Sequence, residues 1–289
     1  MTLSKTMRIA AVQLYIDRTN AGNNWARAKD YVKKAAEAKA DLVVFPEYFI
    51  SMSVNAFPEL LPRIVALAQE YDIDIVTGTY PEKGKDGKLY NCCSYVDKEG
   101  IVLLTYRKVH LWHPEREKFT PGNSFGTVVN RFGIKVGLCV CWDIAFNDCF
   151  TEMALNQDAE LIVAPSYWAL EDAGDIGQRY RQDSEVQLLN AMCTARSFEN
   201  GIVMVFVNGA SSPLQYGQRD NSSLVKSDHL TLAGRTQITA PFKGVLARCD
   251  HSYEEMLIQD VDIGQMTLDA ETVYKIRDDW KLKKDAAKL

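Results

Sequence analysis

The first third of the chain shows two spacings of apolar residues, one after the other and then repeated. Short runs of consecutive apolar residues are typical of buried strands, and the segments between them place apolar residues every three to four positions, as helices with one buried face do. Asn23 is placed to cap the first of these helices. The pattern predicts two successive β-α-β units, with strands at 7–14, 42–45 and 72–80 and helices at 23–39 and 62–71.

The middle of the chain changes to hairpins and then returns to alternating strands and helices. Strands at 92–96 and 101–106 flank the turn at 97–100, and a second hairpin around 131–133 leads into a strand at 134–140. Beyond it we expect a helix, a buried strand, a long helix and another buried strand, at 147–157, 161–165, 181–199 and 202–207.

The last quarter of the sequence is less regular. Residues 209–243 contain many Gly, Ser and Asn residues, and we expect a loop-rich surface segment there. Two short strands at 245–248 and 256–261 and a charged helix at 268–280 complete the prediction. Because no repeat, linker or break in composition divides the chain, the sequence predicts one mixed α/β domain.

Composition narrows the class of protein. Of the 289 residues, 47% are hydrophobic and 25% are charged, which are ordinary proportions for a globular enzyme. The net charge of -5 and the lack of a Lys/Arg block argue against a nucleic-acid surface, so the expected partner is a small molecule. The first residues do not form the apolar core of a signal peptide, and no apolar run reaches the roughly 18 residues that span a membrane, which favours a cytoplasmic protein.

Seven cysteines, set mostly in apolar segments, indicate reduced thiols rather than a disulfide framework. Two of them, Cys139 and Cys141, lie two residues apart where an apolar run meets Trp142 and Asp143. A zinc site needs further closely spaced Cys or His ligands, and a redox pair is expected to have Cys-x-x-Cys spacing, so neither is favoured. Two alternatives remain open from the residues alone: buried core thiols, or a nucleophile and its neighbour.

Position along the predicted strand distinguishes the two thiols. Cys141 comes at the strand end, where a turn into a helix can point backbone N–H groups at a developing oxyanion. Cys139 lies between Leu138 and Val140 and is better explained as a small apolar core residue. Cys141 is therefore the candidate nucleophile of the pair.

A nucleophilic thiol needs a base, and none of the four histidines is an obvious partner. Glu47 follows Pro46 at the end of a predicted strand, where burial would raise its pKa and suit it to accept a proton. Lys108 follows another predicted strand. Taken singly, Glu47 is as easily explained as a solvated loop carboxylate, and Lys108 as an ordinary surface lysine.

Three segments together resemble the nitrilase superfamily, also called the carbon-nitrogen hydrolases: Pro46-Glu47, Tyr106-Arg-Lys-Val-His-Leu111 and Gly137-Leu-Cys-Val-Cys-Trp-Asp143. Flanking motifs extend the resemblance over nearly the whole chain. It implies an α/β fold, the four-layer α-β-β-α sandwich of this family, as one domain over residues 1–289 with a core at about 7–265 and a helical tail at about 266–289. It also implies a homodimer or larger homo-oligomer.

The resemblance implies a catalytic triad of Glu47, Lys108 and Cys141. Cys141 would attack an amide carbonyl or nitrile carbon, and Glu47 would pass the thiol proton to the departing ammonia. Lys108 would stabilise the oxyanion. No metal or organic cofactor is implied.

Many relatives carry a second glutamate before a Pro-Gly turn. Both Glu115 and Glu117 precede Pro121, and the six-residue spacing of Glu115 fits the family pattern better. We therefore expect Glu115 to hold Lys108 and orient the substrate, and Glu117 to be a solvated loop acid.

The residues after the nucleophile resemble two branches of the family. Trp142 is more typical of nitrilases, whereas Asp143 and Phe146 are more typical of amidases. Ala145 stands where some relatives have an arginine that binds a substrate carboxylate. We expect an amidase that releases ammonia and a carboxylic acid through a cysteine thioester; the alternatives are a nitrilase, an N-carbamoyl amidohydrolase and, more remotely, a non-catalytic binding protein on the same fold.

Other side chains are candidates for binding the substrate. Three aromatic residues could line a pocket for an apolar or planar substrate, or could pack in the core or an interface: Trp142, Tyr167 and Trp168. Arg179, Arg181 or Arg196 could supply the positive charge that Ala145 lacks only if the chain folds back over the site. Solvated or structural roles explain these arginines better.

Overall fold

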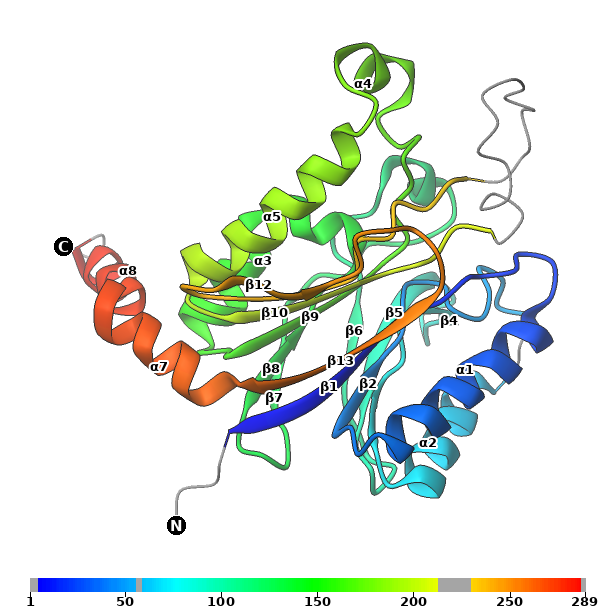
Figure 1. Cartoon of the computed structure of the whole chain (residues 1–289), viewed down its shortest axis with the longest axis horizontal. Helices are drawn as coiled ribbons and strands as arrows, with labels where there is room; N and C mark the ends of the chain where they lie inside the picture. Colours follow the sequence, from blue (N-terminus) through cyan, green and yellow to red (C-terminus); the bar gives the residue numbers. More distant parts are fainter. Residues whose placement is uncertain (1–4, 56–58, 213–229, 287–289) are drawn as a thin grey trace.

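Two β-sheets lie face to face, and helices cover both outer faces, in the computed structural model of the chain (Figure 1). The structure describes residues 5–55, 59–212 and 230–286. The architecture is the predicted four-layer α-β-β-α sandwich. Within the described ranges, no helix is long and apolar enough to cross a bilayer.

The first sheet has the strand order β13-β1-β2-β3-β5-β4, and β6 also pairs with β5. The neighbours β1, β2 and β3 run parallel, as two β-α-β units require, while β13 lies antiparallel to β1. Its strands are β1 (Thr6–Gln13), β2 (Leu42–Val44), β3 (Asp74–Val76), β4 (Tyr80–Lys83), β5 (Leu89–Val96), β6 (Val102–Arg107) and β13 (Glu255–Asp262).

The second sheet has the order β12-β11-β10-β9-β8-β7. Its central strands β8, β9 and β10 are parallel, so their carboxyl ends meet at one edge of the sheet. Its strands are β7 (Thr127–Val129), β8 (Lys135–Leu138), β9 (Leu161–Ser166), β10 (Val203–Asn208), β11 (Gln237–Ala240) and β12 (Gly244–Arg248).

Strand β1 shows why the central strands are apolar at nearly every position. Because successive side chains point to opposite faces, Met7 and Ile9 pack between the two sheets, whereas Ala10 and Val12 pack against the outer helices. Those helices are α1 (Ala21–Glu37) and α2 (Leu60–Tyr71), which lie side by side below the first sheet in Figure 1. The predicted cap of α1 was three residues late, since the Asn20 side chain accepts the hydrogen bond from Asn23 N.

The helices on the second sheet differ from the prediction in their ends. The long helix α5 begins after the short helix α4, and the segment predicted as one helix at 147–157 is α3 followed by a π-helix (Thr151–Asn156). The charged tail helix is two helices rather than one, because Lys275 adopts a left-handed φ of 52° between them. The ranges are α3 (Asn147–Phe150), α4 (Gly174–Tyr180), α5 (Ser184–Asn200), α7 (Ile263–Tyr274) and α8 (Ile276–Ala286).

The predicted loop at 209–243 is wrong in its last part. Gln237–Ala240 form strand β11, which is fully buried between β10 and β12. The polar residues of the segment are typical of a surface loop, so the sequence does not indicate this strand. Thr239 is buried all the same, because its hydroxyl donates a hydrogen bond to Cys193 O inside the fold. Residues 213–229 of the predicted loop lie outside the described ranges.

Candidate active site

Three predicted residues converge at the carboxyl ends of strands from both sheets. Glu47 follows β2, Lys108 follows β6 and Cys141 follows β8, and all three line one cavity of about 380 Å³. Polar groups at the carboxyl ends of strands are where α/β proteins usually bind ligands. The sandwich therefore brings together residues that are up to 94 positions apart in the sequence, Glu47 and Cys141.

Glu47 is held between the two sheets. Its backbone N–H donates to Ser166 O at the end of β9, at 3.2 Å. The backbone at Gly78, which has a φ of +63°, lies directly against the loop that carries Glu47. A Cβ on residue 78 would lie 2.1 Å from Pro46 O, so only glycine fits at this position. The strand predicted at 72–80 is interrupted at this point because the chain turns to hold the Glu47 loop.

Cys141 begins a short 3-10 helix directly after an extended Val140 and has a left-handed φ of 49°. Such a backbone costs on the order of 1 kcal/mol or more in a residue with a side chain, so the surroundings must hold it. The buried carboxylate of Asp143 does so, accepting hydrogen bonds from Val140 N at 2.8 Å, His110 N at 2.8 Å and Tyr106 Oη at 2.7 Å. The turn thus presents Cys141 to the cavity from a braced backbone.

Cys139 lies in the core as expected. Its side chain is fully buried among the apolar residues between the sheets, and it is not among the residues that line the cavity. Of these two thiols, Cys141 lines the cavity and Cys139 does not.

Lys108 is almost wholly buried and bridges two carboxylates. Its Nζ donates to Glu47 Oε1 at 2.9 Å and to Glu115 Oε2 at 2.6 Å. The Pro121-Gly122 turn holds the backbone of Lys108, because Gly122 N donates to Lys108 O at 2.8 Å. Only glycine fits there, since a Cβ on residue 122 would lie 2.1 Å from Arg107 O. The lysine is thereby held both at its backbone and at its charge.

The charges of these groups follow from burial and from one another. Burial raises the pKa of Glu47 to about 6, although the nearby Lys108 opposes the shift. Burial also raises the pKa of the Cys141 thiol well above its usual value, and the charge of Glu47 adds to this effect. At neutral pH the resting site therefore contains a Glu47 carboxylate and a Cys141 thiol.

Lys108 and Glu115 each stabilise the charged form of the other. Burial alone would lower the pKa of Lys108, but the neighbouring carboxylates, Glu47 first, outweigh it and raise the pKa. Burial would raise the pKa of Glu115, but the Lys108 ammonium outweighs it and lowers the pKa. Lys108 is consequently an ammonium and Glu115 a carboxylate at neutral pH.

Of the two candidate second acids, the structure brings Glu115 to the site and leaves Glu117 outside. Besides Lys108, Glu115 accepts a hydrogen bond from Trp112 N at 2.8 Å, which holds it at the start of a 3-10 helix (His113–Glu117). Glu117 is exposed and does not line the cavity. The position agrees with the preference for Glu115.

Two residues of this network were missed by the sequence analysis. Asn91 Nδ2 donates to Glu47 Oε1 at 2.8 Å and to Glu115 Oε1 at 3.1 Å. The Tyr48 hydroxyl accepts from Asn91 Nδ2 at 3.0 Å and donates to Glu115 Oε1. One signal is the polar Asn91 inside the mostly apolar strand β5. The other is that Tyr48 directly follows Glu47.

The expected aromatic residues do line the cavity: Trp142, Tyr167 and Trp168. The Trp142 and Trp168 ring centroids lie 5.5 Å apart, and Trp168 Nε1 donates to Glu185 Oε2 at 2.6 Å, which fixes that ring. Arg196 is structural, because its guanidinium donates to Ile144 O at 3.0 Å and Ala145 O at 3.2 Å.

The two remaining arginines are likewise not part of the cavity. Arg179 lies on α4 and Arg181 directly follows it; both are exposed, and neither lines the cavity. Their solvated position agrees with the expectation from the sequence.

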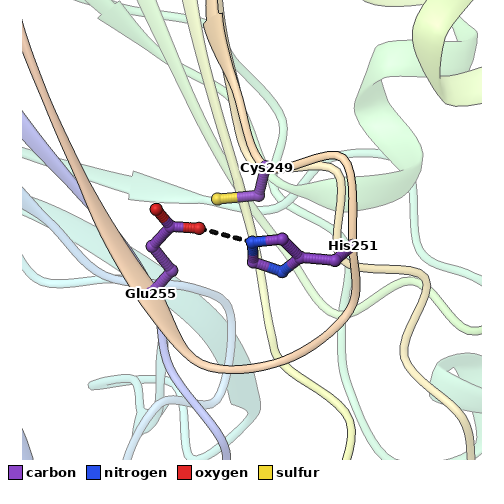
Figure 2. A group of neighbouring side chains, drawn as sticks. All are labelled: Cys249, His251 and Glu255. Atoms are coloured by element: carbon purple, nitrogen blue, oxygen red, sulfur yellow. Dashed lines mark hydrogen bonds and ion pairs between the residues drawn. The ribbon is translucent and has the colours of Figure 1, made fainter.

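A group with metal-binding side chains lies elsewhere in the molecule. Cys249, His251 and Glu255 offer a thiol, an imidazole and a carboxylate whose ligand atoms lie within 4.8 Å of one another (Figure 2). Such a mixed donor set suits zinc or a similar transition metal. None of the three lines the cavity that contains Cys141, and the Glu255 carboxylate is already hydrogen-bonded to His251.

The chain is similar to known proteins over nearly its full length. The family model of carbon-nitrogen hydrolases matches residues 8–271. A probable nitrilase of Schizosaccharomyces pombe is 27% identical over 88% of each chain, and an omega-amidase of Mus musculus is 28% identical over 90% of each chain. A mutant amidase from Nesterenkonia, solved in complex with butyramide, superimposes with a TM-score of 0.73 at 22% identity over 91% of this chain and 93% of that one.

The family match and the architecture agree. The chain belongs to the carbon-nitrogen hydrolase family. Its fold is that of the nitrilase superfamily.

Proposed function

We propose that the protein is an amidase that hydrolyses a small amide to a carboxylic acid and ammonia, with Cys141 as the nucleophile. The observation that carries this proposal is the convergence of Glu47, Lys108 and Cys141 in one cavity, with a buried ion pair between the first two. Relatives named as an omega-amidase and an amidase support an amide substrate. Glu115 completes the proposed catalytic machinery.

The first half of the reaction forms a thioester. Glu47 accepts the thiol proton as Cys141 Sγ bonds to the amide carbonyl carbon, and the carbonyl oxygen becomes an oxyanion. The Lys108 ammonium stabilises that charge, together with the backbone N–H that follows Cys141. When the intermediate collapses, the carbon–nitrogen bond breaks and Glu47 returns the proton to the nitrogen, which leaves as ammonia.

The second half releases the acid. Glu47 accepts a proton from water, the water oxygen bonds to the thioester carbonyl carbon, and a second oxyanion forms near Lys108. Collapse breaks the carbon–sulfur bond, and the proton held by Glu47 returns to Cys141 Sγ. A carboxyl pKa of about 6 suits this repeated use, because Glu47 is largely ionised at neutral pH yet basic enough to accept a proton.

Other cavity residues position the reacting groups. We assign to Glu115 the task of holding Lys108, since its carboxylate lies 2.6 Å from Lys108 Nζ. The aromatic side chains Trp142, Tyr167 and Trp168 form the wall against which the acyl part of the substrate packs.

An ammonia-release assay tests the proposal. Purified protein is incubated with panels of primary amides, nitriles and N-carbamoyl compounds, alongside Cys141→Ala and Cys139→Ala. We expect amides to be hydrolysed by the wild type and Cys139→Ala and not by Cys141→Ala. Activity on nitriles alone supports the nitrilase alternative, to which the similarity to a probable nitrilase also points. Activity on N-carbamoyl compounds alone supports that third alternative, and no activity on any panel supports a non-catalytic binding protein.

We further propose that residues 1–289 form one domain of this family, assembled as a homodimer or larger homo-oligomer in the cytoplasm. The match of the family model to residues 8–271 supports the single domain. The helical tail starts near the predicted boundary of 266, with α7 beginning at Ile263. Light scattering coupled to size-exclusion chromatography tests the assembly, and a monomeric mass would refute it.

A further inference from the structure

A carboxylate that the proposed mechanism does not use lines the same cavity as Cys141. Asp172 follows β9, and its Oδ2 accepts a hydrogen bond from Ala169 N at 2.9 Å, which holds the side chain in place. In the described part of the chain, no Lys, Arg or His forms an ion pair with Asp172. A partly buried carboxylate without a cation is costly, so its presence in a ligand cavity requires an explanation.

A second carboxylate lies close to Asp172. Glu185, in the first turn of α5, is buried and accepts the bond from Trp168 Nε1 at 2.6 Å. Burial raises the pKa of Asp172 to about 6, and the charge of Glu185 adds to the shift, so Asp172 is ionised at pH 7.5. Glu185 likewise has no ion pair with a described residue. Within residues 5–55, 59–212 and 230–286, these two neighbouring carboxylates thus have no cation in direct contact, and the charge of Lys108 only partly opposes the rise in the Asp172 pKa.

The basic side chains described in the cavity wall already have hydrogen-bond partners in the protein. Of the described lining residues, Lys108 and Lys118 are the basic ones. Lys108 is bonded to two carboxylates, and exposed Lys118 donates to Met52 O. The cavity wall also includes Trp142 and Trp168, and tryptophan is the side chain whose ring attracts a cation most strongly.

We propose that Asp172 determines specificity by binding a protonated amine on the acyl part of the substrate, so that the preferred substrates are small primary amides carrying an ammonium group. This inference rests on the proposed amidase function, which places the amide at Cys141. The ammonium would supply the missing counter-charge of Asp172 and pack against the tryptophan faces.

Matched substrates of equal length test the inference. The kcat/KM values of δ-aminovaleramide, hexanamide and adipic acid monoamide are compared at pH 7.5; the first carries an ammonium where the others carry a methyl group or a carboxylate. We expect the wild type to prefer δ-aminovaleramide over hexanamide by about 10- to 100-fold, chiefly through KM, and to use the acid least well. Asp172→Asn should remove the preference by lowering kcat/KM for δ-aminovaleramide far more than for hexanamide. Asp175→Asn, at an exposed position on α4, is the control variant and should retain the preference for δ-aminovaleramide.

A measurement on the wild type alone covers the case in which Asp172→Asn does not fold. n-Butylamine should inhibit hexanamide hydrolysis competitively, and the neutral 1-butanol should be at least about tenfold weaker. Hexanamide hydrolysis without a preference for the amine, or an unchanged preference in a folded Asp172→Asn, overturns the inference and leaves the amidase proposal standing. If the wild type hydrolyses no amide at all, the amidase proposal itself fails.

Discussion

Lys108 Nζ lies 2.9 Å from Glu47 Oε1, and only 1% and 2% of the two side chains are exposed. Water compensates little for the loss of either partner in a pair buried this deeply, so the charges of the two groups depend on each other. Lys108 keeps Glu47 ionised in spite of its burial, and Glu47 keeps Lys108 protonated. In the proposed mechanism, this one contact therefore sets the charge both of the base and of the group that stabilises the oxyanion.

The pH dependence of activity should follow the ionisation of Glu47. Because burial raises its pKa to about 6, the free enzyme loses its base as the pH falls through 6, and kcat/KM should drop about tenfold per pH unit below that value. It should stay level from about pH 7 upward while the thiol remains protonated. A neutral amide is the substrate for this profile, so that Asp172 does not contribute. A profile that stays level down to pH 5 would contradict Glu47 as the base.

Lys108→Met should abolish activity and destabilise the protein. The substitution leaves Glu47 and Glu115 as neighbouring buried carboxylates without their shared cation, and breaking such a pair costs about 3–5 kcal/mol. We expect kcat/KM to fall at least about 10³-fold, as for loss of an oxyanion donor. Urea unfolding and steady-state kinetics measure both effects. The exposed Lys88→Met is the control, and equal behaviour of the two variants would refute the role of Lys108.

Glu115→Gln and Glu117→Gln should behave differently although they lie two residues apart. Gln at 115 removes the charge that faces Lys108 at 2.6 Å, and we expect kcat to fall by about 10²-fold. Gln at 117 changes an exposed side chain and should leave kcat within about twofold. Similar kinetics in both variants would remove the support for Glu115 as the second acid.

Asp143→Asn should destabilise the turn that carries Cys141. The carboxylate is fully buried and accepts hydrogen bonds from Val140 N and Tyr106 Oη, and an amide that turns its NH₂ group toward these donors leaves them unsatisfied. We expect a loss of about 1–3 kcal/mol in the free energy of unfolding. Asp148→Asn, whose side chain is 64% exposed, should change it by less than about 0.5 kcal/mol. Chemical denaturation of both variants provides the comparison, and an unchanged Asp143→Asn would show that the turn does not depend on this network.

The sequence predicted the positions of the candidate site better than its supporting contacts. Glu47, Lys108 and Cys141 each follow a strand, so their meeting at one edge of the sandwich could be expected once their motifs were combined. Their catalytic roles stay predictions. Asn91 and Asp172 were missed because their importance depends on tertiary neighbours that no local pattern encodes.

The errors in the fold have the same origin. The strand predicted at 72–80 is interrupted between Val76 and Tyr80, where the backbone of Gly78 approaches Pro46. The segment that forms β11 has the polarity of a loop, because its polar Thr239 is hydrogen-bonded inside the core. Local periodicity could not reveal either contact. The division of the tail at Lys275 depends on one left-handed residue, which helical periodicity alone does not indicate.

Trapping the acyl-enzyme tests the central claim most directly. Wild-type protein turning over a good amide substrate is quenched in acid within its first turnovers, digested and examined by peptide mass spectrometry. We predict that the peptide carrying Cys139 and Cys141 gains the mass of the acyl group, that fragmentation places it on Cys141, and that Cys139→Ala still forms the adduct whereas Cys141→Ala does not. An adduct on another residue, or one that persists in Cys141→Ala, would contradict the assignment of the nucleophile.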